Sequence, residues 1–296
     1  MDEGREISTF TLEECKNRFL HHIKIINQKT GKSNTEVFWS FIDWNFWMTM
    51  WETRKVAEKL EMTEFAPYDK ETCKERAFAA RDFLLKEKCG VSFGIMQNLW
   101  VQGVAIGKCD FLLELTNAKD LNKNHRMLSK ELGQFFTPKC VTDLIARMIS
   151  SPEDDEKRNS VCDPAAGFGG MLISDWYKYD GMAKPAGSRI YFASELSTRT
   201  ARACFLNMVI HNIPAVVDNI NSLSQERISP RWFTPLLLMI MKLSQPTEWD
   251  ENILLSNPPF TKEFGLHWLA DMMMEDSKGN PEYNESMKKW REKYCN

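Results

Sequence analysis

The residues best suited to chemistry follow a short apolar run that ends at an acidic side chain. Residues 160–172 read Ser-Val-Cys-Asp-Pro-Ala-Ala-Gly-Phe-Gly-Gly-Met-Leu, so Asp163 is followed by Gly167, Gly169 and Gly170 and then by an apolar helical pattern. A strand, a glycine turn and a helix in this order open a ligand pocket at the carboxyl end of a parallel sheet. Glycine has no Cβ, so the backbone of such a turn can approach a ligand closely. The spacing is not that of a dinucleotide-binding fingerprint, because Leu172 stands where a third glycine would be required.

A second carboxylate stands at the end of a second predicted strand. Residues 189–194 read Arg-Ile-Tyr-Phe-Ala-Ser and lead to Glu195, thirty-two residues after Asp163. A carboxylate in this place can accept hydrogen bonds from the two adjacent hydroxyls of a ribose, as it does in dinucleotide-binding folds. For Glu195 taken alone, a surface glutamate without a ligand is the alternative.

Two further motifs flank these carboxylates. Residues 133–138 read Gly-Gln-Phe-Phe-Thr-Pro, and residues 257–260 read Asn-Pro-Pro-Phe. In this order and at these separations, the four motifs resemble those of the N-6 adenine DNA methyltransferases, in particular the modification subunit of type I restriction-modification systems. The resemblance covers roughly residues 130 to 262. The helical pattern over residues 198–211, which follows Glu195, matches the same family and favours the binding role of that carboxylate.

The resemblance implies a pocket for S-adenosylmethionine, the methyl donor of the family. In it the glycine turn and Asp163 lie against the cofactor, and Glu195 binds the ribose. Asn221 is the nearest match to the residue that faces the adenine ring, and the segment from Gln134 to Pro138 lies near the methionine end. The cofactor-binding residues that the resemblance implies are Gln134, Phe135, Phe136, Thr137, Pro138, Asp163, Pro164, Ala165, Gly167, Gly169, Gly170, Glu195 and Asn221.

The resemblance also places methyl transfer at Asn257-Pro258-Pro259-Phe260, after a predicted fourth strand over residues 253–256. An adenine amino group is a poor nucleophile because its lone pair is delocalised into the ring, so it must be positioned and polarised. The side-chain oxygen of Asn257 and the carbonyl of Pro258 can each accept one of its N–H groups, and the prolines, Pro259 included, stiffen the loop. Phe260 offers a face on which a flipped-out base can stack. This chemistry requires no metal and no nucleophilic side chain.

The glycine turn departs from the family in two places. The usual sequence is Asp-Pro-Ala-Cys-Gly-Thr-Gly-Gly-Phe, whereas Ala166 and Phe168 stand here at the fourth and sixth positions. Alanine for cysteine is a small change. Phenylalanine for threonine is bulkier, and we expect it to remove a hydroxyl group from the wall of the cofactor pocket.

Together the motifs predict an α/β fold with two domains. A helical N-terminal domain, residues 1–128, precedes a Rossmann-like, S-adenosylmethionine-dependent methyltransferase domain, residues 129–296, and the polar stretch over residues 117–132 marks the junction. We expect an incomplete sheet, truncated after the Asn-Pro-Pro-Phe strand, because the family's sheet has seven strands and only thirty-six residues follow Phe260. With a strand order of 3-2-1-4, the fourth strand would lie at an open edge.

The N-terminal domain is predicted to be helical because its apolar residues recur at intervals of three and four. The sequence Ser33-Asn34-Thr35-Glu36 is typical of a capping box at the start of a second helix. Aromatic residues are dense between residues 38 and 51, and they could form either a base-stacking surface or a core. Their helical spacing favours the core. A third helix is predicted from the spacing of Cys73, Ala77, Ala80 and Leu84.

The sequence predicts a helix after Thr137 but leaves the secondary structure of residues 232–241 open. Thr137 is expected to cap a helix whose first residue is Pro138, with free N–H groups that suit a carboxylate. Its expected buried stripe consists of Val141, Leu144, Ile145 and Met148. Residues 232–241 form the most apolar run in the chain, and periodicity leaves three alternatives open for it: a buried helix, an extra strand or an interface.

Composition bounds the class of protein. The formal net charge is −3, so any hold on nucleic acid must come from a local patch or from a partner subunit. The eight cysteines contain no C-x-x-C pair, so we expect reduced, mostly buried thiols and no metal site. No apolar stretch approaches the length of a membrane span and the N-terminus is polar, which predicts a cytoplasmic protein that does not enter membranes.

These observations favour an enzyme that methylates the N6 amino group of adenine in DNA within a restriction-modification-like system. A similar motif serves methyltransferases that act on a glutamine side chain of release factors, but residues 133–138 favour the DNA group. The alternative is an inactive, methyltransferase-derived protein that binds the cofactor or a partner; Phe168 and the short C-terminal segment favour it, while Asn257 to Phe260 favour the enzyme.

Besides DNA, we expect a partner to complete the sheet. A specificity subunit or a second copy of the chain would dock near residues 232–260. Charged substitutions at Leu237 and Met239 are then expected to disrupt that assembly without unfolding the cofactor site.

Overall fold

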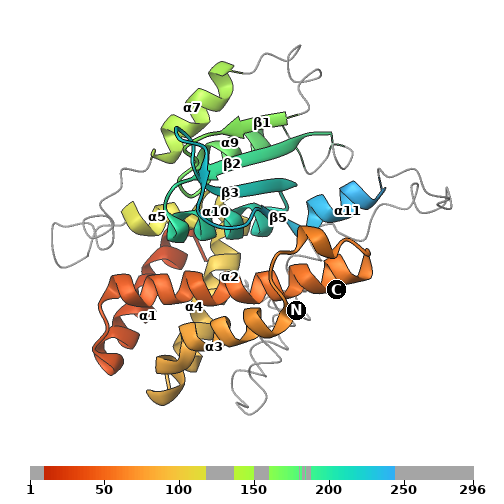
Figure 1. Ribbon diagram of the computed structural model, residues 1–296. Helices are drawn as coiled ribbons and strands as arrows, with labels where there is room; N and C mark the ends of the chain where they lie inside the picture. Colours follow the sequence, from red (N-terminus) through yellow and green to blue (C-terminus); the bar gives the residue numbers. More distant parts are fainter. Residues whose placement is uncertain are drawn as a thin grey trace, which may run out of the picture.

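The computed structural model describes residues 10–117, 137–149, 160–179 and 188–243, together with residues 181 and 184. The long helices α1 to α4 lie on one side of the molecule and the strands on the other, with helix α10 between them (Figure 1). The predicted fold class is confirmed at this level: a mixed α/β protein with a helical N-terminal region and a sheet. The predicted fourth strand, residues 253–256, lies outside the described residues, so the incomplete sheet stays a prediction.

The N-terminal region consists of helices, as predicted. They are α1 (Leu12–Thr30), α2 (Asn34–Lys59), η1 (Thr63–Phe65, a 3₁₀ turn), α3 (Lys70–Lys86), α4 (Gly90–Gly107) and α5 (Phe111–Asn117). Helix α2 begins at the predicted capping box, in which the Ser33 hydroxyl accepts the Glu36 N–H and the Glu36 carboxylate accepts the Ser33 N–H. Thr11 and Glu14 form a second capping box, which the sequence analysis did not identify.

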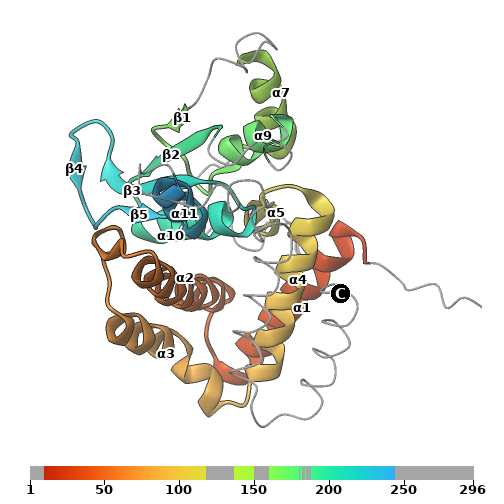
Figure 2. The same cartoon turned by 90° about the vertical axis from the view of Figure 1, so that its right-hand side faces the viewer.

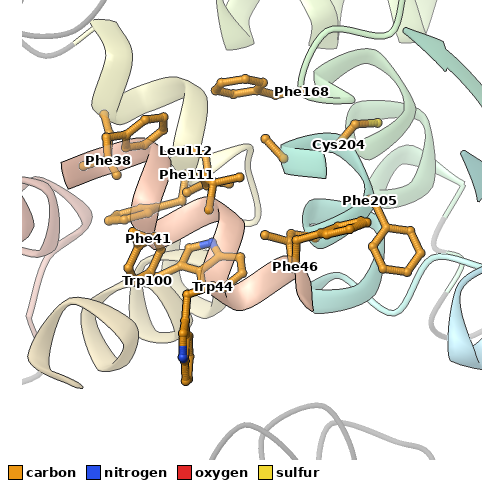
Figure 3. Close-up of a cluster of buried hydrophobic side chains, with 14 of the residues drawn as sticks. Phe38, Phe41, Trp44, Phe46, Trp100, Phe111, Leu112, Phe168, Cys204 and Phe205 are labelled. Carbon is orange, nitrogen blue, oxygen red and sulfur yellow. The ribbon is translucent and has the colours of Figure 1, made fainter. Parts of the chain in front are cut away.

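Aromatic side chains of α2 lie at the centre of the hydrophobic core (Figure 3). Phe38, Phe41 and Phe46 are fully buried, and Trp44 is 1% exposed. Phe41 meets Trp100 of α4 edge to face, with 5.7 Å between ring centroids. Rings without exposed faces cannot stack on a base, so the prediction that this stretch forms a core is confirmed.

The sheet is built around three parallel strands: β1 (Ser160–Asp163), β2 (Ile190–Glu195) and β3 (Ala215–Asn221). Helix α9 (Gly170–Lys178) connects β1 to β2, and helix α10 (Thr198–Ile210) connects β2 to β3. The strands adjoin in the order β1-β2-β3, which agrees with the predicted order for these three. Parallel strands end at the same edge, so the residues at and after the ends of all three strands meet there.

Residues 232–243 form both a short strand and a buried helix. Strand β5 (Trp232–Phe233) pairs antiparallel with β3, as does β4 (Glu226–Arg227), and helix α11 (Pro235–Leu243) follows. Figure 2 shows α11 near the end of β3, above α2. Leu238 of α11 packs with Ala57 and Ala66 in a small cluster. The sequence left a buried helix and an extra strand as alternatives for this segment, and the structure contains both.

The prediction that charged substitutions in this segment would disrupt only an assembly is wrong. Leu237 is 2% exposed and Met239 is 8% exposed, so both side chains are already buried inside this chain. A charge at either position would be buried without a partner, which destabilises the fold itself.

The predicted buried stripe of helix α7 (Lys139–Ile149) is also wrong. Its members are exposed in part: Val141 by 39%, Leu144 by 56% and Met148 by 76%, with Ile145 half-buried. The face of α7 that is buried instead carries Thr142 and Ala146. It faces α9, where the Thr142 and Ser174 hydroxyls are hydrogen-bonded at 2.8 Å. Periodicity identified the apolar face of the helix, but the face that is buried carries Thr142 and Ala146.

The hydrophobic core continues from the N-terminal helices to the sheet. The ring of Phe46 in α2 lies 5.7 Å from that of Phe205 in α10 and 4.7 Å from that of Trp232 in β5. An ion pair between Asp43 and Arg202, 2.6 Å apart, joins α2 to α10 at the rim of this contact. The predicted domain boundary at residue 128 lies outside the described residues and stays a prediction.

Two predictions from composition can be examined in the described part of the chain. The cysteines there are free thiols: Cys15, Cys73, Cys89, Cys109 and Cys204 are buried as predicted, and Cys140 and Cys162 are exposed. Among the helices that the structure describes, none combines the length and apolar character that crossing a bilayer requires.

Candidate functional site

The glycine turn joins β1 to α9 at the carboxyl edge of the sheet. Gly167 has φ +57° and Gly169 has φ +89°, in the left-handed region where side chains other than glycine are strained. A Cβ on Gly169 would lie 2.6 Å from Met208 Cε and 3.1 Å from Cys204 Sγ, both on α10. The backbone conformation therefore favours glycine at this position, and a side chain here would also displace the Met208 methyl group.

Hydrogen bonds fix the backbone of the turn. The Asp163 carboxylate accepts the N–H of Ala165 at 3.0 Å, and the Gly169 N–H donates to the carbonyl of Ala166 at 2.7 Å. The Ala166 N–H donates to the carbonyl of Ser194 on β2 at 2.9 Å. Asp163 thus helps to shape the turn that it precedes.

The Glu195 carboxylate lies beside the same turn. Its Oε2 accepts the Gly167 N–H at 3.1 Å, and its Oε1 accepts the Ser197 N–H at 2.8 Å. Burial raises the pKa of Glu195, while these two N–H donors act in the opposite direction. A carboxylate offers about four lone-pair sites, so Glu195 can accept hydroxyl groups of a ligand as well.

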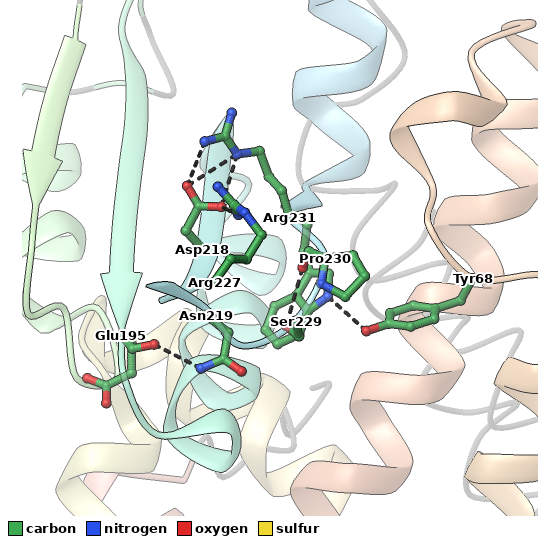
Figure 4. A network of polar contacts seen from close by, with 9 residues as sticks. Tyr68, Glu195, Asp218, Asn219, Arg227, Ser229, Pro230 and Arg231 are labelled. Atoms are coloured by element: carbon green, nitrogen blue, oxygen red, sulfur yellow. Dashed lines mark hydrogen bonds and ion pairs between the residues drawn. The ribbon is translucent and has the colours of Figure 1, made fainter. Parts of the chain in front are cut away.

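Asn219 directs the chain as it leaves β2 (Figure 4). Its side chain is fully buried, and its Nδ2 donates to the backbone carbonyls of Glu195 at 3.0 Å and Leu196 at 2.9 Å. Its Oδ1 accepts the Thr198 hydroxyl at 2.9 Å. Sequence analysis missed this residue. The available signal was an amide side chain in β3, opposite Glu195 in the register.

Asn221 is the last residue of β3 and precedes a tight turn. Its Oδ1 accepts the N–H groups of Leu223 and Ser224 at 3.0 and 3.2 Å. The next residue, Ser222, donates its hydroxyl to the carbonyl of Pro164 in the glycine turn, at 2.5 Å. The structure therefore brings the end of β3 to the glycine turn, but the oxygen of Asn221 is engaged by its own loop, and the predicted contact with an adenine ring stays a prediction.

Asp218, on β3, stabilises the short antiparallel pair β3–β4 through ion pairs with two arginines (Figure 4). Arg231 binds its carboxylate with two nitrogens, at 2.9 and 3.0 Å, and Arg227 forms a further ion pair. Burial alone would raise the pKa of Asp218, but the hydrogen bonds from both arginines outweigh it and lower that pKa. The Asp218 carboxylate is therefore occupied by these two arginines and is not offered to a ligand.

The expectation for Phe168 is wrong. Its side chain is 1% exposed and points away from the sheet edge into the core (Figure 3). It stacks on Phe38 with 6.5 Å between centroids and an interplanar angle of 27°, and meets Trp39 edge to face at 6.3 Å. The substitution relative to the family therefore extends the contact with α2 and does not line the edge where Glu195 lies.

Other predicted site residues are placed only in part. Helix α7 begins at Lys139, one residue later than predicted, and the Pro138 carbonyl accepts the N–H of Thr142 at 3.1 Å. Thr137 and Pro138 are both exposed. Gln134, Phe135 and Phe136 lie outside the described residues, as do Asn257, Pro258, Pro259 and Phe260, so their roles stay predictions.

Comparison with known proteins identifies the family of this chain. The model of the family N-6 DNA Methylase matches residues 120–293, more than half of the chain. The Type I restriction enzyme MpnII methylase subunit of Mycoplasma pneumoniae is 24% identical over 154 residues, which cover 48% of this chain and 23% of that subunit. The chain thus matches about a quarter of the length of this relative.

A solved structure gives a weaker likeness. The type I restriction-modification system methyltransferase subunit from Streptococcus thermophilus is 16% identical, with a TM-score of 0.32, over 69% of this chain and 57% of that one. The family match covers the glycine turn, Glu195 and the Asn-Pro-Pro-Phe motif together, so this chain belongs to the N-6 DNA methylase family.

Proposed function

We propose that this protein transfers a methyl group from S-adenosylmethionine to the N6 amino group of adenine in DNA. The observation that carries the proposal is the position of the Glu195 carboxylate at the end of β2, hydrogen-bonded to the Gly167 N–H of the glycine turn. Family membership supplies the class of reaction, DNA methylation.

The residues at the sheet edge fit an adenosyl group. Glu195 accepts the two ribose hydroxyls, which form charge-assisted hydrogen bonds to a carboxylate that burial has already desolvated in part. Gly167 and Gly169 leave the turn free of side chains, so the backbone comes close to the ligand. The sheet that carries these residues is, in this proposal, the Rossmann-like sheet of the family.

Asn257 and Pro258 hold the target amino group in this proposal. Each supplies one oxygen that accepts an N–H of the adenine amine, so the nitrogen lone pair points toward the methyl group instead of into the ring. Phe260 stacks on the flipped base. No residue of the chain needs to form a covalent bond with the substrate.

DNA is the substrate, and the net charge of −3 leaves its hold on DNA to a local patch or a partner. A specificity subunit is the partner that the family resemblance suggests. Methylase subunits of type I restriction enzymes are the kind of protein to which the relative from Mycoplasma pneumoniae belongs by name.

The alternative of an inactive binding protein loses one of its two reasons. Phe168 was expected to alter the pocket wall, but its ring lies in the core. The test that decides between the two is transfer of radiolabelled methyl groups from S-adenosylmethionine to mixed-sequence DNA, followed by identification of the labelled nucleoside. Label in N6-methyl-2′-deoxyadenosine supports the enzyme; cofactor binding without any transfer supports the alternative.

Replacing Glu195 with alanine is expected to weaken the affinity for S-adenosylmethionine by about 1.5–3 kcal/mol, the contribution of hydrogen bonds to a charged group. The change removes the acceptor of the ribose hydroxyls and of the Gly167 N–H together. Isothermal titration calorimetry measures it, with Glu75→Ala, an exposed helical glutamate, as the matched control. Unchanged affinity in the Glu195 variant would contradict the proposed ribose contact.

Replacing Asn257 with alanine is expected to reduce methyl transfer by on the order of a hundredfold or more, as loss of one preorganised group does in other enzymes. The affinity for S-adenosylmethionine should stay within about twofold, because Asn257 faces the acceptor amine. Single-turnover transfer and calorimetry on the same variant separate the two effects. A variant with full activity would show that adenine is not activated in this way.

A further inference from the structure

A carboxyl group outside the predicted site is buried at the start of helix α5. Asp110 is 5% exposed. Its Oδ1 accepts the N–H of Leu113 at 2.9 Å and the side-chain Nδ2 of Asn207 at 2.9 Å. Its Oδ2 is buried and has no hydrogen-bond partner among the described residues. The bond from Leu113 caps α5, but burying a carboxylate that is only partly satisfied is costly.

Asn207 connects this carboxyl group to the glycine turn. It lies on α10 and is fully buried. Besides its bond to Asp110, its Nδ2 donates to the backbone carbonyl of Phe168 at 2.8 Å. The two hydrogen atoms of one amide therefore join the N-terminal helices to the backbone of the turn.

The residue held in this way lies at the centre of the turn. The N–H before it, that of Gly167, donates to Glu195, and the residue after it, Gly169, has the left-handed backbone that starts α9. The Phe168 ring packs on α2, and the Phe168 carbonyl accepts a hydrogen bond from Asn207 of α10. Both groups of this residue are therefore held by helices outside the turn. Asp110 Oδ2 lies 3.7 Å from the point that a Cβ on Gly170 would occupy, so its carboxyl group abuts the turn directly.

We propose that Asp110 and Asn207 form a buried clamp that holds the Phe168 carbonyl and thereby keeps the glycine turn in the shape that binds the methyl donor. This inference rests on the proposed function for its ligand, but not for the shape of the turn. Both are positioning residues: neither touches the ligand, and each acts through the peptide groups of Phe168 and Gly167. The helical N-terminal region is then a working part of the cofactor site and not an appended domain.

The test uses the full-length protein and two readouts. Asn207→Ala is expected to weaken binding of S-adenosylmethionine on the order of tenfold, the effect of losing hydrogen bonds that involve a charged group. In the absence of ligand, hydrogen–deuterium exchange of a peptide over residues 163–172 should accelerate by a similar factor, because release of the Phe168 carbonyl lets the turn open more often and breaks the hydrogen bonds of the Gly167 and Gly169 N–H groups. Asp110→Ala removes the oxygen that Leu113 and Asn207 bind, and it should weaken binding and accelerate exchange of residues 163–172 as Asn207→Ala does.

Asn45→Ala is the matched control. Asn45 is also a buried helical asparagine, which donates to the Phe41 carbonyl at 2.7 Å and accepts from Gln97 at 3.1 Å, within the N-terminal helices. It should lower thermal stability as Asn207→Ala does, with no change in affinity or in exchange of residues 163–172. Equal effects of both variants on exchange would overturn the clamp, as would unchanged exchange in Asn207→Ala. If the unmutated protein binds no S-adenosylmethionine, the proposed function fails, and the exchange comparison alone decides whether the clamp holds the turn.

Discussion

Replacing Phe168 with threonine, the residue usual in the family at this position, is expected to destabilise the protein by about 3–5 kcal/mol, the range of large-to-small changes at buried aromatic residues. The ring is 1% exposed and packs between Phe38 and Trp39. Its removal leaves a cavity between the glycine turn and α2, and the new hydroxyl is buried in an apolar environment. Equilibrium unfolding in urea measures the loss.

Phe78→Thr supplies the control for this prediction. Phe78 lies on α3 and is 42% exposed, so its removal leaves no closed cavity, and a cost of about 1 kcal/mol or less is expected. A Phe168→Thr protein as stable as this control would show that the ring does not fill the core. Because the ring lies in the core, restoring the family's threonine alone should not improve cofactor binding.

The stability of an Asp110→Asn protein, relative to the unmutated one, is expected to increase by up to about 4 kcal/mol between pH 4 and pH 8. Burial raises the pKa of Asp110 from 3.8 to about 7, against the hydrogen bonds from Leu113 and Asn207. Between these two values the folded protein binds one proton more than the unfolded chain, so its stability falls as the pH rises through this window and stays lower above it. One pKa unit corresponds to about 1.4 kcal/mol, and the whole window therefore to about 4 kcal/mol.

Unfolding free energies of both proteins, measured at intervals across this pH range, give the difference directly. The unmutated protein by itself is a poor reporter, because His211 acts in the opposite direction. Burial lowers the pKa of His211 from 6.5 to about 3, so its contribution to stability is lost as the pH falls below 6.5. The His211 contribution cancels in the comparison. Parallel stability curves for the two proteins would show that Asp110 ionises in the folded state near its ordinary pKa.

The clamp and the Phe168 contact have a common consequence for how the protein works. Both reach the glycine turn from residues that precede the family's own motifs: Asp110, just before α5, and Phe38 on α2. A change in the packing of the N-terminal helices would alter the backbone that carries the Gly167 N–H and, through it, the Glu195 carboxylate. Partner binding to those helices would therefore be felt at the proposed cofactor site.

The sequence by itself determined the elements and the edge at which chemistry is placed. Ser33 and Glu36 predicted the start of α2, because a capping box is closed within four residues. Asp163, the glycines and Glu195 predicted two adjacent strand ends, because parallel strands must finish at one edge. The capping box depends on residues that are neighbours along the chain, and the strand ends follow from the way parallel strands are connected. Both can be recognised from the spacing of residues in the sequence.

Only the tertiary structure decided which side of each element is covered and by what. Phe168 turns into the core because α2 offers it two aromatic rings, and the apolar face of α7 is left exposed because Thr142 finds a hydroxyl on α9. The bonds of Asn207 to Asp110 and to Phe168 join residues 97 and 39 positions apart in the chain. No local pattern specifies such a pair. Periodicity reports only on residues that are close in sequence, whereas these hydrogen bonds form where distant elements pack together.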